Sequence, residues 1–175
     1  MARSRAAFAG TLDGEARLLL LIDAFSGGAG GLQGRTKLAK LDFLLRYPRF
    51  FVRAMEARNA DVVAELDPAE ENNIESRMVR HRYGPWDPSY YAVLGALAGR
   101  GLITTVPARN YRGIKTTELG GRVAAELRAS EAWEPVADRA RQLRRTFPDH
   151  TGTFLKNFIY EHFPEVTRAS WGERL

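Results

Sequence analysis

Hydrophobic residues recur every three or four positions along most of this chain, a spacing that predicts a mainly helical protein. The clearest case is residues 36–47, where Thr36 is a candidate N-cap and leucines follow at helical spacing. A first helix is expected to begin at Asp13, after a flexible tail over residues 1–11. Further helices are expected over residues 48–55, 88–100, 118–127, 131–146 and 152–163.

The pattern changes between residues 102 and 117, where β-branched residues predict two short strands. Residues 102–106 and 114–117 are the expected strands, and residues 107–113 are the expected turn. Gly101 suits the end of the preceding helix, and Thr117 suits the cap of the next one. This order predicts a winged helix-turn-helix with a β-hairpin wing. We therefore expect a winged-helix domain over residues 12–130 and a C-terminal helical extension over residues 131–175 packed on it.

The helix before the hairpin decides what such a fold could bind. Its expected core face carries Tyr91, Leu94, Leu97 and Ala98. The remaining residues are small or apolar and offer little to a base edge, which favours packing against another helix or chain over reading DNA. The alternative is that this face is buried within the protein itself. The residues expected off the core face are Ser89, Ala92, Val93, Gly95, Ala96, Gly99 and Arg100.

Aromatic residues cluster just before this helix, around the sequence YGPW. They either fix a corner of the core or form the centre of a partner-binding surface, where Trp and Tyr are enriched. Together with the helix face, they give one set of predicted partner-binding residues: Trp86, Tyr90, Ala92, Ala96 and Arg100.

Charge adds a second candidate surface. The formal net charge is +5, and a basic stretch over residues 35–58 precedes an acidic one over residues 61–75. Basic residues on the hairpin and in the basic stretch could contact the backbone of double-stranded DNA without reading its sequence. An ordinary polar turn and solvated charges are the alternative. The predicted nucleic-acid-binding residues are Arg109, Arg112, Lys115, Lys37 and Lys40.

No pattern points to catalysis. The three histidines lack metal-binding spacing, and the chain has no cysteine. The glycine-rich residues 27–34 fail as a phosphate-binding loop, because Ala29 stands where the first glycine belongs and Arg35 replaces the lysine. We expect no enzyme activity, no cofactor, no metal and no small-molecule substrate. The longest apolar run, Leu18 to Ile22, is too short to cross a membrane, so a cytoplasmic protein is expected.

Several segments carry a resemblance to known families. The block GRGLITTVPARNYRGIKTTELGGRVAAEL is similar to the strand–wing–strand–helix ending of winged-helix transcription factors. Residues 34–50, 77–103 and 151–166 together resemble the middle components of bacterial ABC-three-component defence systems, and more weakly the Panacea (SocA-like) proteins. The resemblance to the ABC-three-component middle components implies a non-enzymatic adaptor that bridges an SMC-like ABC ATPase and an effector subunit. A DNA-binding winged-helix transcriptional regulator is the alternative.

Overall fold

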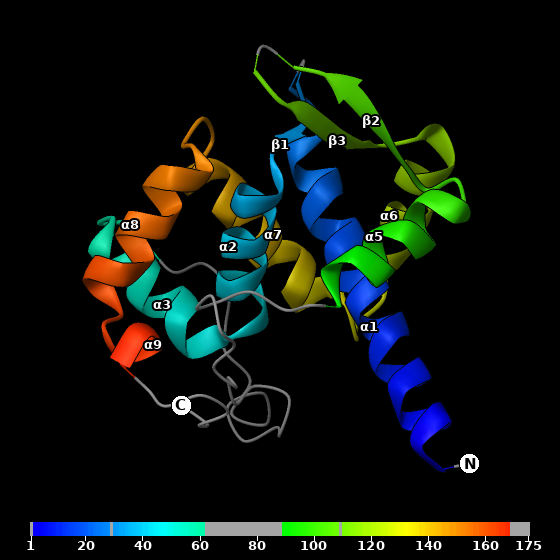
Figure 1. Ribbon diagram of the computed structural model, residues 1–175, viewed down its shortest axis with the longest axis horizontal. Helices are drawn as coiled ribbons and strands as arrows, with labels where there is room; N and C mark the ends of the chain where they lie inside the picture. Colours follow the sequence, from blue (N-terminus) through cyan, green and yellow to red (C-terminus); the bar gives the residue numbers. More distant parts are fainter. Residues whose placement is uncertain (1, 29, 62–88, 109, 169–175) are drawn as a thin grey trace. The chain divides into compact units, whose positions relative to one another are not determined.

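The computed structural model describes residues 2–28, 30–61, 89–108 and 110–168 (Figure 1). These residues are mainly helical and include a small antiparallel sheet, as the sequence predicts. The strands are β1 (Leu32–Gln33), β2 (Ile103–Pro107) and β3 (Arg112–Thr116). The helices are α1 (Ala2–Phe25), α2 (Arg35–Arg46), α3 (Pro48–Ala57), α5 (Tyr90–Gly99), α6 (Glu118–Arg128), α7 (Glu134–Thr146), α8 (Gly152–His162) and α9 (Glu165–Arg168).

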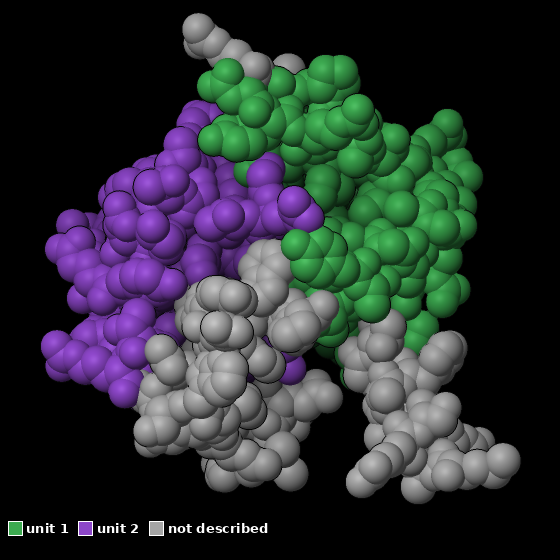
Figure 2. All heavy atoms as spheres, viewed as in Figure 1, with its two compact units in different colours: residues 1–33, 88–137 green, residues 34–87, 138–175 purple. Residues whose placement is uncertain are grey.

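The chain forms two compact units that differ from the expected domains (Figure 2). Unit 1 consists of residues 1–33 and 88–137, and unit 2 of residues 34–87 and 138–175. Both units are discontinuous in sequence. The cause is the packing of α2 against α8, two helices more than a hundred residues apart.

The N-terminal residues also differ from expectation. The sequence predicts a flexible tail over residues 1–11, but α1 is helical from Ala2 onward. The first ten residues are rich in alanine and arginine, which have high helix propensity, and proline is absent there. The helix expected from Asp13 is thus extended by local propensity toward the N-terminus.

The core of unit 1 forms around α1, which packs against α5, α6 and β3. Leu18 to Ile22 are all buried. The sheet has the order β1-β3-β2, with both pairs antiparallel. Ile103 and Ile114 lie on the same face of β2 and β3 and are buried. Strand β1 is not predicted by the sequence, because two residues are too few to show an alternating pattern.

The short-range signals around the hairpin are confirmed. Gly101 ends α5 with φ +71, a conformation that favours glycine. Thr117 caps α6, its side chain accepting a hydrogen bond from the Gly120 amide at 3.0 Å. The Thr117 hydroxyl also donates to the Gly101 carbonyl at 2.6 Å. A Cβ on Gly120 would lie 1.9 Å from the Leu102 carbonyl oxygen, so the start of α6 lies directly against the end of α5.

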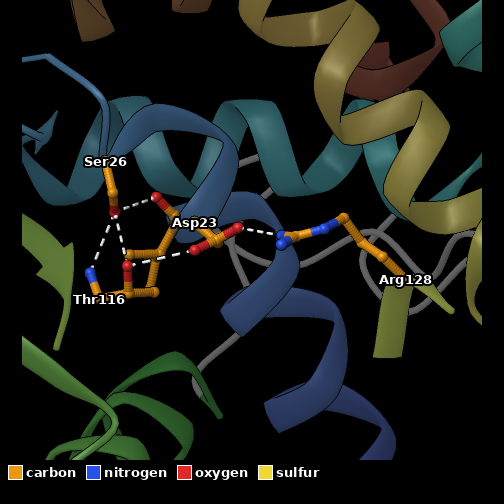
Figure 3. Close-up of polar contacts among 5 residues, drawn as sticks. Asp23, Ser26, Thr116 and Arg128 are labelled. Atoms are coloured by element: carbon orange, nitrogen blue, oxygen red, sulfur yellow. Dashed lines mark hydrogen bonds and ion pairs between the residues drawn. The ribbon is translucent and has the colours of Figure 1, made fainter. Parts of the chain in front are cut away.

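A polar network ties the end of α1 to the sheet and to α6 (Figure 3). Asp23 accepts a hydrogen bond from the Thr116 hydroxyl at 3.2 Å and pairs with Arg128. Ser26 accepts from the Thr116 amide at 3.0 Å and donates to the Ile22 carbonyl at 2.7 Å. The end of α1 therefore meets β3 and α6, which follow each other directly but lie far from α1 in sequence, at one carboxylate and one hydroxyl.

Unit 2 is built on α2, which packs against α3 and α8. The leucines expected on the apolar face of this helix (Leu38, Leu41, Leu44 and Leu45) are buried. The helix begins at Arg35 with Gly34 as N-cap, so Thr36 is not the cap that the sequence predicts. Pro48 opens α3, where its missing amide hydrogen costs nothing.

Replacement of Asp23 by alanine should lower the free energy of unfolding by about 2 kcal/mol, because the Arg128 guanidinium and the Thr116 hydroxyl lose their acceptor in a partly buried place. Urea unfolding measures the change. The control is Arg122→Ala, which removes an exposed pair with Glu118 and should change stability much less. Equal losses in the two variants would show that the network contributes nothing specific.

Candidate interaction surfaces

The exposed face of α5 differs from the one that the sequence predicts. Tyr90, Val93 and Leu97 are buried, whereas Tyr91 is 56% exposed. The expected core face is therefore wrong for Tyr91 and Ala98, and Val93 belongs to the core. The two neighbouring tyrosines exchange roles relative to the prediction. We define the α5 outer face by its exposed residues: Tyr91, Ala92, Gly95, Ala98 and Gly99.

The two glycines on this face, Gly95 and Gly99, are not explained by packing against other described residues. Among the described residues, a Cβ on Gly95 or Gly99 would meet nothing within 4 Å, so no described neighbour requires glycine at either position. Each helical glycine costs about 1 kcal/mol relative to alanine. Gly120, whose Cβ would collide with Leu102, shows the contrasting case where packing requires glycine. The two glycines thus make the α5 outer face flat and also lower the stability of the helix.

The predicted partner-binding residues divide accordingly. Ala92 is exposed, Ala96 is half-buried, and Tyr90 is only 6% exposed and belongs to the core. Arg100 is exposed and forms an ion pair with Glu15 at 2.9 Å. Trp86 lies outside the described residues. The exposed aromatic on this helix is Tyr91, which the helical spacing assigns to the core.

The hairpin has a shorter turn than expected, and its cations do not share one surface. Arg112 and Lys115 lie in strand β3, not at the tip. They are three residues apart, so they project to opposite faces of the sheet. The guanidinium of exposed Arg112 is 3.5 Å from the Thr105 hydroxyl on its own face. Tyr111, at the turn, is 67% exposed.

Arg109 is the third cation predicted on the hairpin, and it lies outside the described residues. The expectation of a cationic tip that includes Arg112 and Lys115 is therefore corrected. The described part of the turn presents the exposed aromatic ring of Tyr111.

The two lysines predicted to contact nucleic acid are buried in unit 2. Lys37 donates to the Pro148 carbonyl at 3.0 Å. Lys40 is 4% exposed, with its amine 5.6 Å from the centre of the Tyr160 ring. Burial lowers the pKa of Lys40 to about 8, and the charge of Lys156 contributes to the shift. Neither amine is open to a polyanion, which corrects the expectation that this pair forms a basic surface.

A row of aromatic and histidine rings lies along α8 and is not among the features predicted from the sequence. His150, Phe154, Phe158 and His162 are spaced by four residues, and neighbouring ring centres are 4.4, 6.2 and 4.5 Å apart. We call this set the α8 aromatic row. Phe158 is buried, whereas Phe154 is 37% exposed. The spacing of four is visible in the sequence, but by itself it indicates only the apolar face of a helix.

Arginines of α3 and its C-terminal end lie against the aromatic side chains of the C-terminal helices. The Arg58 guanidinium is 5.7 Å from the Phe147 ring centre and 5.8 Å from that of Phe154. Arg53 lies 4.7 Å from the Phe163 ring centre and pairs with Glu165. Arg53 is thus held within the fold, whereas Arg58 is exposed.

Within the described ranges, no three His, Cys, Asp or Glu side chains lie close enough together to hold a metal ion. In the same part of the chain, no helix combines the length and the apolar character needed to cross a membrane.

The buried amine of Lys40 predicts a dependence of stability on pH. The unfolded chain binds this proton up to its ordinary pKa of 10.5, whereas the folded chain releases it near 8. Between these values the unfolded state binds more protons, so stability should rise with pH over that window and be lowest below pH 8. Lys40→Met should therefore stabilise the fold at pH 7 by on the order of 2 kcal/mol.

Urea unfolding at pH 7 and pH 10 measures this effect. The Lys40→Met variant should lose most of the rise in stability with pH. The control Lys156→Met removes only the smaller cause of the shift and should keep most of it. Destabilisation by Lys40→Met at pH 7 would instead show that the charged amine supports the fold.

Two exposed surfaces therefore stand out, the α5 outer face in unit 1 and the exposed part of the α8 aromatic row with Arg58 in unit 2. Comparison of the chain with protein-family models, with curated proteins and with solved structures found no match.

Proposed function

We propose that this protein is a non-enzymatic winged-helix adaptor that binds a partner protein through the α5 outer face. The order of elements in unit 1 supports the winged helix: a helix, a short strand, a later helix, a hairpin and a final helix. The sheet order β1-β3-β2 supports it further, because the first strand of a winged helix pairs with the returning strand of its wing.

The chemistry of α5 supports protein binding over base reading. In a DNA-reading winged helix, the helix before the wing enters the major groove and needs side chains that match base edges. Among the five residues of the α5 outer face, only Tyr91 has a hydrogen-bonding side chain. A regulator that reads sequence through this helix is therefore disfavoured.

A flat face of small residues allows another helix to approach closely. Tyr91 supplies the large, partly apolar side chain that dominates many protein interfaces. The single observation that carries the proposal is the pair Gly95 and Gly99, both of which are exposed and have no neighbour in the described part of the chain that requires glycine. A partner that packs closely on this face would explain why glycine stands at both positions although it destabilises the helix.

The resemblance of residues 34–50, 77–103 and 151–166 to ABC-three-component middle subunits suggests the partners. We propose an SMC-like ABC ATPase on one side and an effector subunit on the other, within an antiviral defence complex of the cytoplasm. The net charge of +5 leaves sequence-independent contact with the DNA backbone as a secondary activity.

The central experiment is co-expression with the proposed partner, an SMC-like ABC ATPase, followed by purification of the complex. Gly95→Leu should lower the yield of complex at least ten-fold, because a branched side chain would hold a closely packed partner away. Gly95→Ala should raise the free energy of unfolding by about 0.5–1 kcal/mol, since its methyl group would meet no atom of the described residues within 4 Å.

The matched control is Glu126→Leu, which places the same leucine on an exposed position of α6. Thermal unfolding of both leucine variants checks that the fold is kept. Failure of the wild-type protein to form any complex with the ATPase would refute the adaptor function. Equal complex formation by wild type and Gly95→Leu would refute the α5 outer face as the interface.

Contact of the hairpin with the DNA backbone has its own test. Arg112→Glu should weaken duplex binding at least five-fold at low salt without changing the melting temperature, since Arg112 is exposed and its hydroxyl contact is long at 3.5 Å. Fluorescence anisotropy with two unrelated duplexes measures binding. Unchanged affinity would exclude the hairpin, and a strong preference for one duplex would favour the transcriptional regulator.

A further inference from the structure

The exposed end of the α8 aromatic row forms a second surface that the adaptor function does not use. The rings of His150 and Phe154 are 4.4 Å apart, and Phe147 lies edge-on to His150 at 5.6 Å. Arg58 lies over Phe147 and Phe154, and its Nη2 is 3.4 Å from Nε2 of His150. An arginine, a histidine and an exposed phenylalanine therefore converge at one corner of unit 2, which we call the α3–α8 corner.

Positive charge is in excess around this corner. Burial lowers the pKa of His150, and the charges of Arg58 and Lys37 lower it further against the opposing charge of Asp149. After burial, the charge of Arg144 in turn lowers the pKa of Lys37. Among the described residues, the charges of Arg58 and Lys37 thus act on His150, and the carboxylate of Asp149 opposes them. In residues 34–61 and 138–168 as a whole, Lys and Arg outnumber Asp and Glu.

The helix geometry adds to this field. The α3–α8 corner lies at the N-terminus of α8, where Thr151 caps the helix by accepting from the Phe154 amide at 3.1 Å. The positive end of the helix dipole therefore points toward the same place as the cations. In addition, Nδ1 of His150 is buried and has no hydrogen-bond partner among the described residues. The described part of the chain therefore leaves one polar atom of this corner without a hydrogen bond.

We propose that the α3–α8 corner binds single-stranded nucleic acid, with a base stacked on Phe154 and the adjacent phosphate held by Arg58. An exposed ring beside an arginine is the combination by which proteins hold single strands without reading their sequence. A duplex suits the site less well, because its base faces are covered by stacking with their neighbours. The surface lies in unit 2, so this proposal stands or falls independently of partner binding by the α5 outer face in unit 1.

Charge complementarity favours this occupant over an apolar peptide. Within the described ranges, the exposed residues that converge at the corner are Phe154 and Arg58, and no groove of apolar side chains is formed there. Each phosphate contact with a single strand contributes about 0.7 to the slope of log affinity against log salt. Stacking on an aromatic ring contributes affinity that salt changes little. The two roles can therefore be separated by experiment.

The test is fluorescence anisotropy of the full chain with a labelled twelve-nucleotide dT strand and with a duplex of the same length, over a series of salt concentrations. Phe154→Leu keeps apolar volume and removes the ring, so it should lower single-strand affinity by roughly ten-fold with an unchanged salt slope. Phe154→Trp should restore affinity. Arg58→Gln should lower affinity and reduce the salt slope by about 0.7.

Two control variants show whether an exposed ring or an exposed arginine elsewhere on the chain would serve equally well. Tyr111→Ala removes an exposed ring from the hairpin, and Arg122→Gln removes an exposed arginine from α6. Both should bind the single strand as the wild type does. The proposal is overturned by absence of binding at low salt, by unchanged binding in Phe154→Leu and Arg58→Gln, or by tighter binding of the duplex than of the single strand. Loss of binding in Tyr111→Ala alone would assign the contact to the hairpin and equally overturn it.

Discussion

The carboxylate of Asp23 is the contact on which the arrangement of unit 1 depends. It joins the last turn of α1 to the Thr116 hydroxyl in β3 and to Arg128 in α6. Because β3 pairs with β2, and β2 follows α5 directly, the same contact also fixes the hairpin and the helix before it. The hydrophobic effect that packs side chains around α1 is non-directional, whereas these polar contacts require a defined position of α1 relative to β3 and α6.

The α5 outer face contains residues that lower the stability of its own helix. Gly95 and Gly99 weaken α5, although no atom of the described residues requires a glycine at either position. Departures from local preference without internal compensation are expected where a protein serves a function outside its own fold. In unit 2, the buried lysines face inward, whereas Arg58 stays exposed over aromatic rings. Exposure, more than the number of cations, thus decides which charge is available to a ligand.

Local signals in the sequence predict local structure well. The roles of Gly101 and Thr117 are predicted correctly because a left-handed turn and a helix cap are determined by one or two residues. The buried leucines of α2 are predicted correctly because one strongly amphipathic helix carries its own pattern. The faces of α5 are not, because nearly all its residues are apolar and periodicity could not choose between Tyr90 and Tyr91.

Long-range structure could not be predicted in the same way. The division into two units follows from the packing of α2 against α8, which no local pattern encodes. The burial of Lys40 has the same origin, since its neighbour Tyr160 is far away in sequence. The α8 aromatic row has a visible spacing of four, but its exposed end becomes a candidate site only because Arg58 lies beside it.

Hydrogen exchange of the α5 amides tests most directly whether the α5 outer face is a protein interface. Exchange would be measured with and without the proposed partner, an SMC-like ABC ATPase. We expect the amides from Tyr91 to Gly99 to exchange more slowly in the complex, while those of α8 do not change. Protection confined to other elements, with α5 unchanged in a stable complex, would contradict the proposed interface.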